Sequence, residues 1–513
     1  MFNKKKSTAT AAVSDRASTG IRGLDLILGG GLPPNRLYAV DGDPGTGKTT
    51  LALQFLLAGR LHGQRSLYVT LSETAEELRA TADSHGWSLD GIEIFELAAA
   101  GEGANEEAYT LFHPAEIELE QTIGTVLETV ERIDPSRVVF DSLSEMRLLA
   151  RDPLRFRRQI LALKQFFVGR GCTVLLLDDR SSPEGDLQLH SLAHGVIELE
   201  HVAMEYGSDR RRLQVKKLRA VRFRGGYHDF RIRTGGIEVF PRIFSSEPPP
   251  QSLGDVLSSG SPELDALLGG GIDCGTSMLI TGPAGTGKTT LAAQYALKMA
   301  AGGKHVRLYM FDERVTTFRA RAGELGLEVE KHIAAGTLTI RQIEPTEVSP
   351  GEFAEEIVRA VEDDGVQLVV IDSINGYMHA MPAEQHIAVQ IHELLSYLAN
   401  HRVTAIMTLV QRGIFGSPVD EVAEVSYLAD TVVLVRYFEF AGTVRQAVSV
   451  VKKRSGAHEH TIRECRIERG GFHVGEPLRD FRGVLTGVPE FTGGDQTLMS
   501  QDGVPADGDG RRR

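Results

Sequence analysis

The 513-residue chain has the composition of an ordinary globular protein, with 42% hydrophobic and 24% charged residues, and its length predicts more than one domain. Its net charge of −13 argues against a protein that wraps duplex nucleic acid, because such proteins present a basic face to the phosphates. The cysteines Cys172, Cys274 and Cys465 are too few and too far apart for a disulfide framework or a metal site. There is no run of about 18 apolar residues, so no membrane span is predicted. The sparse cysteines lead us to expect a protein of the reducing cytoplasm.

Sequence blocks from the first half of the chain recur in the same order in the second half. The segment GIRGLDLILGGG at 20–31 returns as GSPELDALLGGG at 260–271, and GDPGTGKTTLALQF from Gly42 returns as GPAGTGKTTLAAQY from Gly282. Further along, RVVFDSL ending at Leu143 returns as LVVIDSI ending at Ile374. Blocks that recur at a nearly constant offset indicate the tandem duplication of one domain.

The duplication predicts the domain organisation of the chain. Residues 14–245 and 253–487 are expected to form the two domains, and the proline-rich segment 246–252 is expected to be an extended linker. Residues 1–13 and 488–513 are expected to be disordered tails, since the C-terminal stretch is rich in Gly, Asp and Ser and has little to bury.

Within each half, short apolar runs alternate with longer segments of helical character. The runs LYAV, SLYVTL, RVVF and TVLLL show no polar alternation, which is typical of strands buried on both faces of a parallel sheet. Segments around 196–234 and 431–468 are expected to add antiparallel strands late in each half. The sequence therefore predicts an α/β fold, with two mostly parallel sheets flanked by helices.

Two glycine-rich segments match the phosphate-binding pattern G-x-x-x-x-G-K-S/T, and each follows an apolar strand and opens a helix-like run. The glycines allow backbone N–H groups to converge on phosphate oxygens, and the helix N-terminus favours negative charge. The lysines are expected to contact the β- and γ-phosphates of ATP, and the first threonine after each lysine is expected to bind Mg²⁺. The candidate binding residues are Gly42, Gly45, Thr46, Gly47, Lys48, Thr49 and Thr50, and then Gly282, Gly285, Thr286, Gly287, Lys288, Thr289 and Thr290.

Acidic residues at strand ends supply the remaining candidates for chemistry. Asp141 and Asp372 end apolar strands, as does the Walker B acid that orients the Mg²⁺ shell. A second acidic position follows the strand after each P-loop helix, where Glu73 stands in the first half and Asp312 and Glu313 stand in the second. A carboxylate there can orient or deprotonate a water or hydroxyl that attacks the γ-phosphate. The alternative is an exposed acid that favours the start of a helix.

Basic residues follow strands late in each half, at Lys217 and Arg219 and again at Lys452 and Arg454. These side chains either neutralise a nucleotide phosphate, most plausibly one bound to a neighbouring subunit, or are solvated surface charges.

The chain resembles the KaiC family of tandem RecA-like ATPases. The resemblance rests on the P-loops at 42–49 and 282–289, the LDxxLGGG openings, the VKKLR and VKKR segments at 215–219 and 451–454, and IREC at 462–465, and it covers residues 14 to about 487. It implies a hexameric double ring with ATP at the subunit interfaces, slow hydrolysis in the N-terminal ring, and autophosphorylation of adjacent Ser and Thr residues in the C-terminal ring.

Residue by residue, the resemblance also shows departures. Lys217, Arg219, Lys452 and Arg454 fall on the basic positions that act on the neighbouring subunit. The paired acids fall on Asp312 and Glu313 in the second half but on Ser72 and Glu73 in the first, so the first acid of that pair is missing. The phosphorylated Ser-Thr pair falls on Ser426 and Tyr427, which leaves Ser426 as the candidate site.

Three functions are compatible with these motifs. The first is a KaiC-like ATPase and possible serine autokinase in signalling or timing, with signalling proteins as partners. The second is a RecA- or RadA-like motor acting on DNA, which the acidic charge disfavours. The third is a scaffold in which bound ATP joins subunits with negligible turnover.

Overall fold

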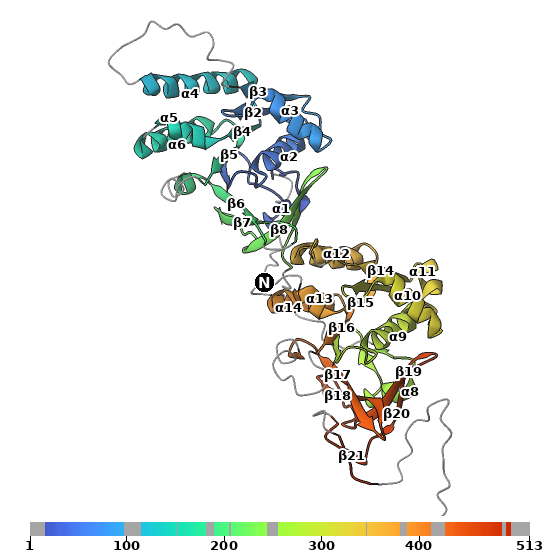
Figure 1. Cartoon of the computed structure of the whole chain (residues 1–513). Coiled ribbons are helices and arrows are strands. Elements are labelled where there is room, and N and C mark those ends of the chain that lie inside the picture. Colours follow the sequence, from blue (N-terminus) through green and yellow to red (C-terminus); the bar gives the residue numbers. More distant parts are fainter. Residues whose placement is uncertain are drawn as a thin grey trace, which may run out of the picture. The chain divides into compact units, whose positions relative to one another are not determined.

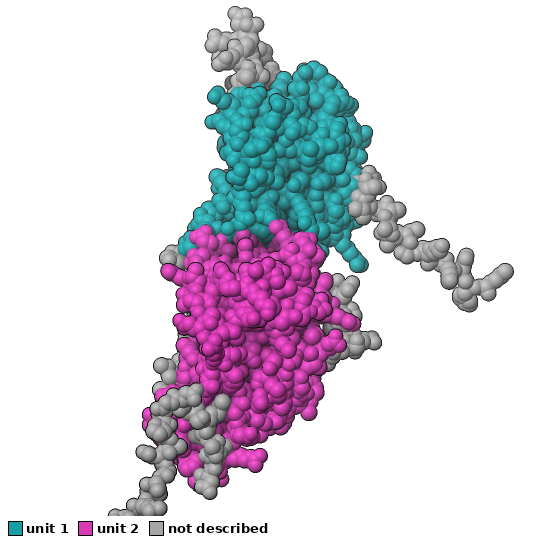
Figure 2. Space-filling model, turned by 90° about the vertical axis from the view of Figure 1, so that its right-hand side faces the viewer, with its two compact units in different colours: residues 1–242 teal, residues 243–513 magenta. Residues whose placement is uncertain are grey.

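The computed structural model describes residues 16–96, 114–150, 152–180, 189–204, 207–243, 255–344, 346–379, 387–411, 426–484 and 489–493. These residues form two compact units, one up to Arg242 and one from Ile243 onward (Figures 1 and 2). The predicted tail 1–13 and linker 246–252 lie outside the described residues, as does most of the predicted tail 488–513. Within the described parts of the chain, no helix has the length and apolar character needed to cross a membrane.

Unit one contains a nine-stranded sheet in the order β3-β2-β4-β5-β1-β6-β7-β8-β9. The strands from β3 to β6 run parallel, and β6 to β9 pair antiparallel. The elements are α1 (Arg22–Ile27), β1 (Leu37–Gly42), α2 (Lys48–Leu61), β2 (Ser66–Thr70), α3 (Ala75–Ser84), β3 (Ile92–Glu96), α4 (Pro114–Ile133), β4 (Arg137–Asp141), α5 (Leu143–Ala150), α6 (Pro153–Phe167), β5 (Thr173–Asp179), β6 (Gly195–Val202), β7 (Arg210–Leu218), β8 (Tyr227–Arg233) and β9 (Gly236–Phe240).

Unit two repeats this arrangement with the strand order β14-β13-β15-β16-β12-β17-β18-β19-β20. Two short antiparallel pairs, β10 with β11 and β21 with β22, lie outside this sheet. The elements are β10 (Val256–Leu257), α8 (Pro262–Leu267), β11 (Ile272–Asp273), β12 (Ser277–Gly282), α9 (Lys288–Ala301), β13 (His305–Met310), α10 (Val315–Glu324), α11 (Val329–Ala334), β14 (Leu338–Gln342), α12 (Pro350–Glu362), β15 (Val366–Asp372), α13 (Ile374–His379), α14 (Ile387–Asn400), β16 (Thr404–Val410), β17 (Thr431–Phe440), β18 (Thr443–Lys453), β19 (Arg463–Glu468), β20 (Gly471–Pro477), β21 (Phe481–Arg482) and β22 (Glu490–Phe491).

The central strands are apolar along their whole length because both faces of each sheet are covered. Successive side chains of β1 point to opposite faces, so Tyr38 and Val40 pack with α1, α2 and α3, while Leu37 and Ala39 pack with α4, α5 and α6. Figure 1 shows these two helical layers on either side of the strands. The predicted α/β class, with late antiparallel strands in each half, is confirmed.

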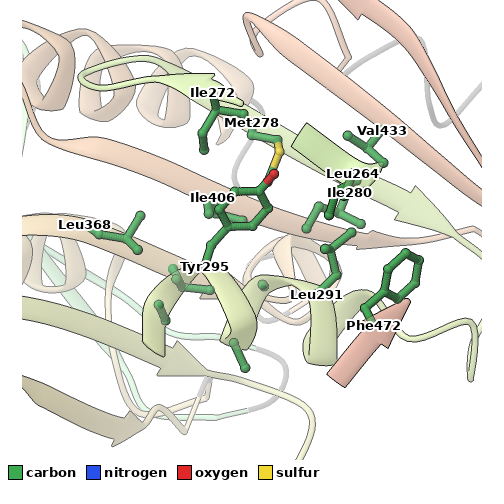
Figure 3. Packing of buried hydrophobic residues seen from close by; sticks show 14 of the residues in the cluster. Leu264, Ile272, Met278, Ile280, Leu291, Tyr295, Leu368, Ile406, Val433 and Phe472 are labelled. Carbon is green, nitrogen blue, oxygen red and sulfur yellow. The ribbon is translucent and has the colours of Figure 1, made fainter. Parts of the chain in front are cut away.

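Packing against the sheet also holds the helix that follows the second P-loop in position. Figure 3 shows Tyr295 of α9 reaching among Met278 and Ile406 of the sheet, in a cluster that also contains Leu291 and Phe472. These side chains are almost fully buried. Burial of one face of α9 against the sheet holds its N-terminus at the end of β12, which positions the loop between them.

Candidate functional site

Each glycine-rich loop lies between a central strand and the helix that follows it. In unit one, Gly45 and Gly47 have φ values of 80° and 101°, and in unit two Gly285 and Gly287 have 79° and 93°, a region that glycine adopts without steric cost. Gly47 and Gly287 are the N-caps of α2 and α9, and neither helix start has a side-chain cap. The first backbone N–H groups of both helices are therefore available to an anion.

The lysine of each loop folds back over the loop and is buried. The ammonium group of Lys48 donates to the carbonyl oxygens of Gly42 at 2.7 Å and Asp43 at 3.0 Å. Lys288 donates to the carbonyl oxygens of Gly282 at 2.9 Å and Pro283 at 2.7 Å. A sheltered ammonium group next to free backbone N–H groups forms a receptor for phosphate oxygens.

The threonine after each lysine lies against the acid at the end of a neighbouring strand. Thr49 donates to Asp141 at 3.2 Å, and Thr289 donates to Asp372 at 2.8 Å. Burial raises the pKa of both carboxyl groups, and the threonine hydrogen bonds act in the opposite direction. A hydroxyl and a carboxylate are the hard oxygen ligands that Mg²⁺ prefers, so these residues fit that ion.

The second acidic position differs between the units. Glu73 is half-buried, and its Oε2 has no hydrogen-bond partner in the described structure. Burial raises its pKa, as does the charge of Asp141. In unit two, Asp312 accepts a hydrogen bond from the Ser373 hydroxyl, and Glu313 pairs with Arg321 at 2.7 Å. Burial raises the pKa of Glu313 as well, against the opposing charge of Arg321.

The basic residues of both units bind backbone carbonyls in the segment before β6 or β17. Lys217 donates to the carbonyls of His190 and Ala193, and Arg219 donates to that of Ser191. Lys452 donates to the carbonyls of Ser426 and Ala429, and Arg454 donates to that of Tyr427. Among the described residues, none of the four basic side chains shows a hydrogen bond to the P-loop of its own unit. Within each unit, the described structure therefore shows no hydrogen bond that joins them to the candidate phosphate-binding residues.

Ser426 lies at the start of that segment in unit two and is half-buried. The adjacent Tyr427 is 54% exposed.

Several supporting residues were not identified from the sequence. The hydroxyl of Tyr68 on β2 donates to Asp141, and the hydroxyl of Thr408 on β16 donates to Asp372. Asp179, the last residue of β5, forms an ion pair with Lys48 at 2.7 Å. A strand that ends in two acids, TVLLLDD, was the available signal for Asp179.

We predict that nucleotide binding to unit two weakens at alkaline pH. Burial lowers the pKa of Lys288 to about 8, with the charge of Asp372 opposing the shift. Above that pH, free Lys288 becomes neutral and must regain a proton to bind phosphate, so the ATP dissociation constant should rise by up to about tenfold per pH unit. Titration of ATP between pH 7 and 9 checks this in a chain carrying Lys48→Ala. An affinity independent of pH over this range would contradict the lowered pKa of Lys288 in the free chain.

A glycine-rich loop between a strand and a helix, backed by a threonine and a strand-end acid, is the arrangement typical of P-loop ATPases, and each unit has one. The family model for the KaiC ATPase matches residues 17–243 and 257–479, so the chain belongs to the KaiC family. It is 25% identical over 488 residues to the circadian clock protein KaiC3 of Synechocystis sp., covering 93% of this chain and 95% of the relative. It is 26% identical over 480 residues to the circadian clock oscillator protein KaiC of Synechococcus elongatus, covering 92% and 91%.

Proposed function

We propose that both units bind ATP with Mg²⁺ and that the protein hydrolyses ATP as a homo-oligomeric, hexameric ring in the cytoplasm, where it acts in signalling or timing. The observation that carries this proposal is the pairing, in both units, of a buried P-loop lysine with a threonine hydrogen-bonded to a strand-end aspartate. Release of phosphate from ATP, and its loss when the lysines are replaced, tests it.

We assign phosphate binding, Mg²⁺ binding and general-base catalysis to different residues of each unit. Lys48 and Lys288 bind the phosphates, while Thr49 with Asp141 and Thr289 with Asp372 would hold Mg²⁺, which neutralises phosphate charge when bound. Glu73 and Glu313 are the candidate general bases, since a raised pKa brings a carboxylate closer to the operating pH. Asp312, which accepts a hydrogen bond from Ser373, is the further catalytic candidate of unit two and the candidate general base for a serine hydroxyl.

We predict that ATP with Mg²⁺ drives assembly of the ring. Lys217, Arg219, Lys452 and Arg454 bind carbonyls in the segments before β6 and β17 rather than their own P-loop, which supports their action on a nucleotide held by a neighbouring subunit. Size-exclusion chromatography with light scattering, with and without nucleotide, measures this. Lys298→Ala, on the P-loop helix but outside the loop, is a control expected to assemble normally. A chain that stays monomeric with both P-loops occupied would refute the interface-site proposal.

We also predict that Ser426 is the principal autophosphorylation site and that Tyr427 is not used. The Tyr427 hydroxyl lies farther from the backbone than a serine hydroxyl, so it does not fit an in-line geometry built for serine. The carbonyls of both residues accept hydrogen bonds from the basic side chains Lys452 and Arg454, which supports a position near an interface. Mass spectrometry after incubation with ATP and Mg²⁺ decides the point. Unmodified Ser426 together with intact ATP turnover would leave an ATPase without kinase activity.

A further inference from the structure

We propose that Asp179 is an affinity-determining residue that competes with nucleotide phosphate for Lys48 and so weakens ATP binding to unit one. The inference rests on the proposed binding of ATP to this unit. It explains how two P-loops of nearly identical sequence can become unequal binding sites within one chain.

Strand register places the acid beside the loop. β5 pairs with β1 so that Asp179 stands opposite Gly42, the first glycine of the P-loop. Its Oδ1 lies 2.7 Å from the Lys48 ammonium nitrogen, and its Oδ2 accepts a hydrogen bond from Ser144 at 2.9 Å. The Lys48 side chain is only 8% exposed and that of Asp179 is 33% exposed, so solvent screens the pair less than a surface ion pair.

The charge state of Asp179 suits this role. Its burial acts to raise the pKa, but the hydrogen bond and the charge of Lys48 outweigh that effect, and the pKa is lowered. Asp179 is therefore ionised at neutral pH and holds the ammonium group that a phosphate would otherwise bind.

Among the described residues of unit two, the position equivalent to Asp179 carries no carboxylate. Opposite Gly282, the corresponding P-loop glycine, the register of β12 with β16 places Val410. No residue in the described part of the chain forms an ion pair with Lys288. Its hydrogen bonds go to the backbone carbonyls of the loop alone.

Other positions near the P-loop also carry acids in unit one and neutral residues in unit two. Asp41 of β1 pairs in register with Glu198 of β6, and both are buried, whereas the matching pair in unit two is Thr281 with Leu434. Asp178, one residue before Asp179, corresponds to Leu409. At these register positions unit one has acids where unit two has neutral side chains. Asp178 is paired with Arg147 and Glu198 with Lys216, so Asp179 is the acid that acts on Lys48.

Binding of a polyphosphate in unit one must separate Lys48 from Asp179 and leave a carboxylate next to anionic oxygens. Like charges at such short range oppose each other, and the separated carboxylate loses a partly sheltered partner. We expect the combined effect to be about tenfold in the ATP dissociation constant, equivalent to about 1.4 kcal/mol.

The test uses the full chain with one nucleotide site disabled. In a chain carrying Lys288→Ala, isothermal titration with Mg²⁺-ATP reports on unit one, and adding Asp179→Asn should tighten binding about tenfold. The matched control is Asp134→Asn, which removes an exposed acid and should change nothing. In the reciprocal chain carrying Lys48→Ala, Val410→Asp should weaken binding to unit two about tenfold.

Equal or weaker ATP binding after Asp179→Asn, with the site still occupied, would overturn the competition while leaving ATP binding to unit one intact. Absence of binding to unit one both with and without Asp179→Asn would instead overturn the proposed nucleotide site in that unit, and the competition with it.

Discussion

Replacing Lys288 with alanine is expected to lower the ATP affinity of unit two by roughly a hundredfold, equivalent to about 2.7 kcal/mol. The side chain is buried and held over the loop by the carbonyls of Gly282 and Pro283, so its charge is fixed where phosphate binds. A charge-assisted hydrogen bond in a sheltered site is worth more than one in water. Lys48→Ala should act in the same way on unit one.

Calorimetric titration of Mg²⁺-ATP checks this through stoichiometry as well as affinity. Each single variant should reduce the number of tight sites per chain from two to one, and the double variant should abolish them. Lys304→Ala, at an exposed position after α9, is the control that should bind like the unmodified chain. Two tight sites surviving in Lys288→Ala would show that this loop does not hold the phosphates.

The second large effect is expected on turnover rather than on binding. Asp312→Asn with Glu313→Gln should reduce ATP hydrolysis by unit two about 100- to 1000-fold, because a positioned general base typically contributes that much to the rate. The ATP dissociation constant should change little, since these carboxylates assist the reaction more than the bound ground state.

Steady-state phosphate release in a chain carrying Lys48→Ala isolates unit two for this measurement. Glu324→Gln, an exposed acid near the end of α10, is the matched control. Normal turnover in the double variant would mean that both acids only stabilise the loop before α10. Glu313 would do so through its ion pair with Arg321.

Much of the fold could be predicted because its signals are local. The strands were visible as uninterrupted apolar runs, since both faces of each sheet are covered, and the P-loops were visible because phosphate binding requires glycine and lysine at fixed spacing. The duplication strengthened both predictions, because each half supports the interpretation of the other.

The side-chain contacts to the P-loop lysine and to the strand-end acid could not be predicted, because they depend on which strands become neighbours in the sheet. Asp179 follows Lys48 by more than a hundred positions, and the pair forms only because β5 lies next to β1. Tyr68 and Asp141 meet in the same way through the pairing of β2 with β4. Sequence spacing carries no direct signal for either contact.

The contacts of the basic residues could not be predicted from the motifs either. The sequence predicts that Lys217 and Lys452 follow strands, but they lie within β7 and β18, and both side chains fold onto backbone carbonyls before β6 and β17. Their proposed action on a neighbouring subunit depends on an assembly that a single chain does not contain.

Incubation of the purified chain with Mg²⁺ and ATP labelled at the γ-phosphate, followed by both phosphate release and phosphopeptide analysis, tests the central claim most directly. We predict release of labelled phosphate without DNA, its abolition when Lys48 and Lys288 are both replaced by alanine, and label on Ser426. Tight ATP binding without phosphate release or protein labelling would contradict the account and indicate a nucleotide-gated scaffold, and release that requires DNA would indicate a DNA-acting motor.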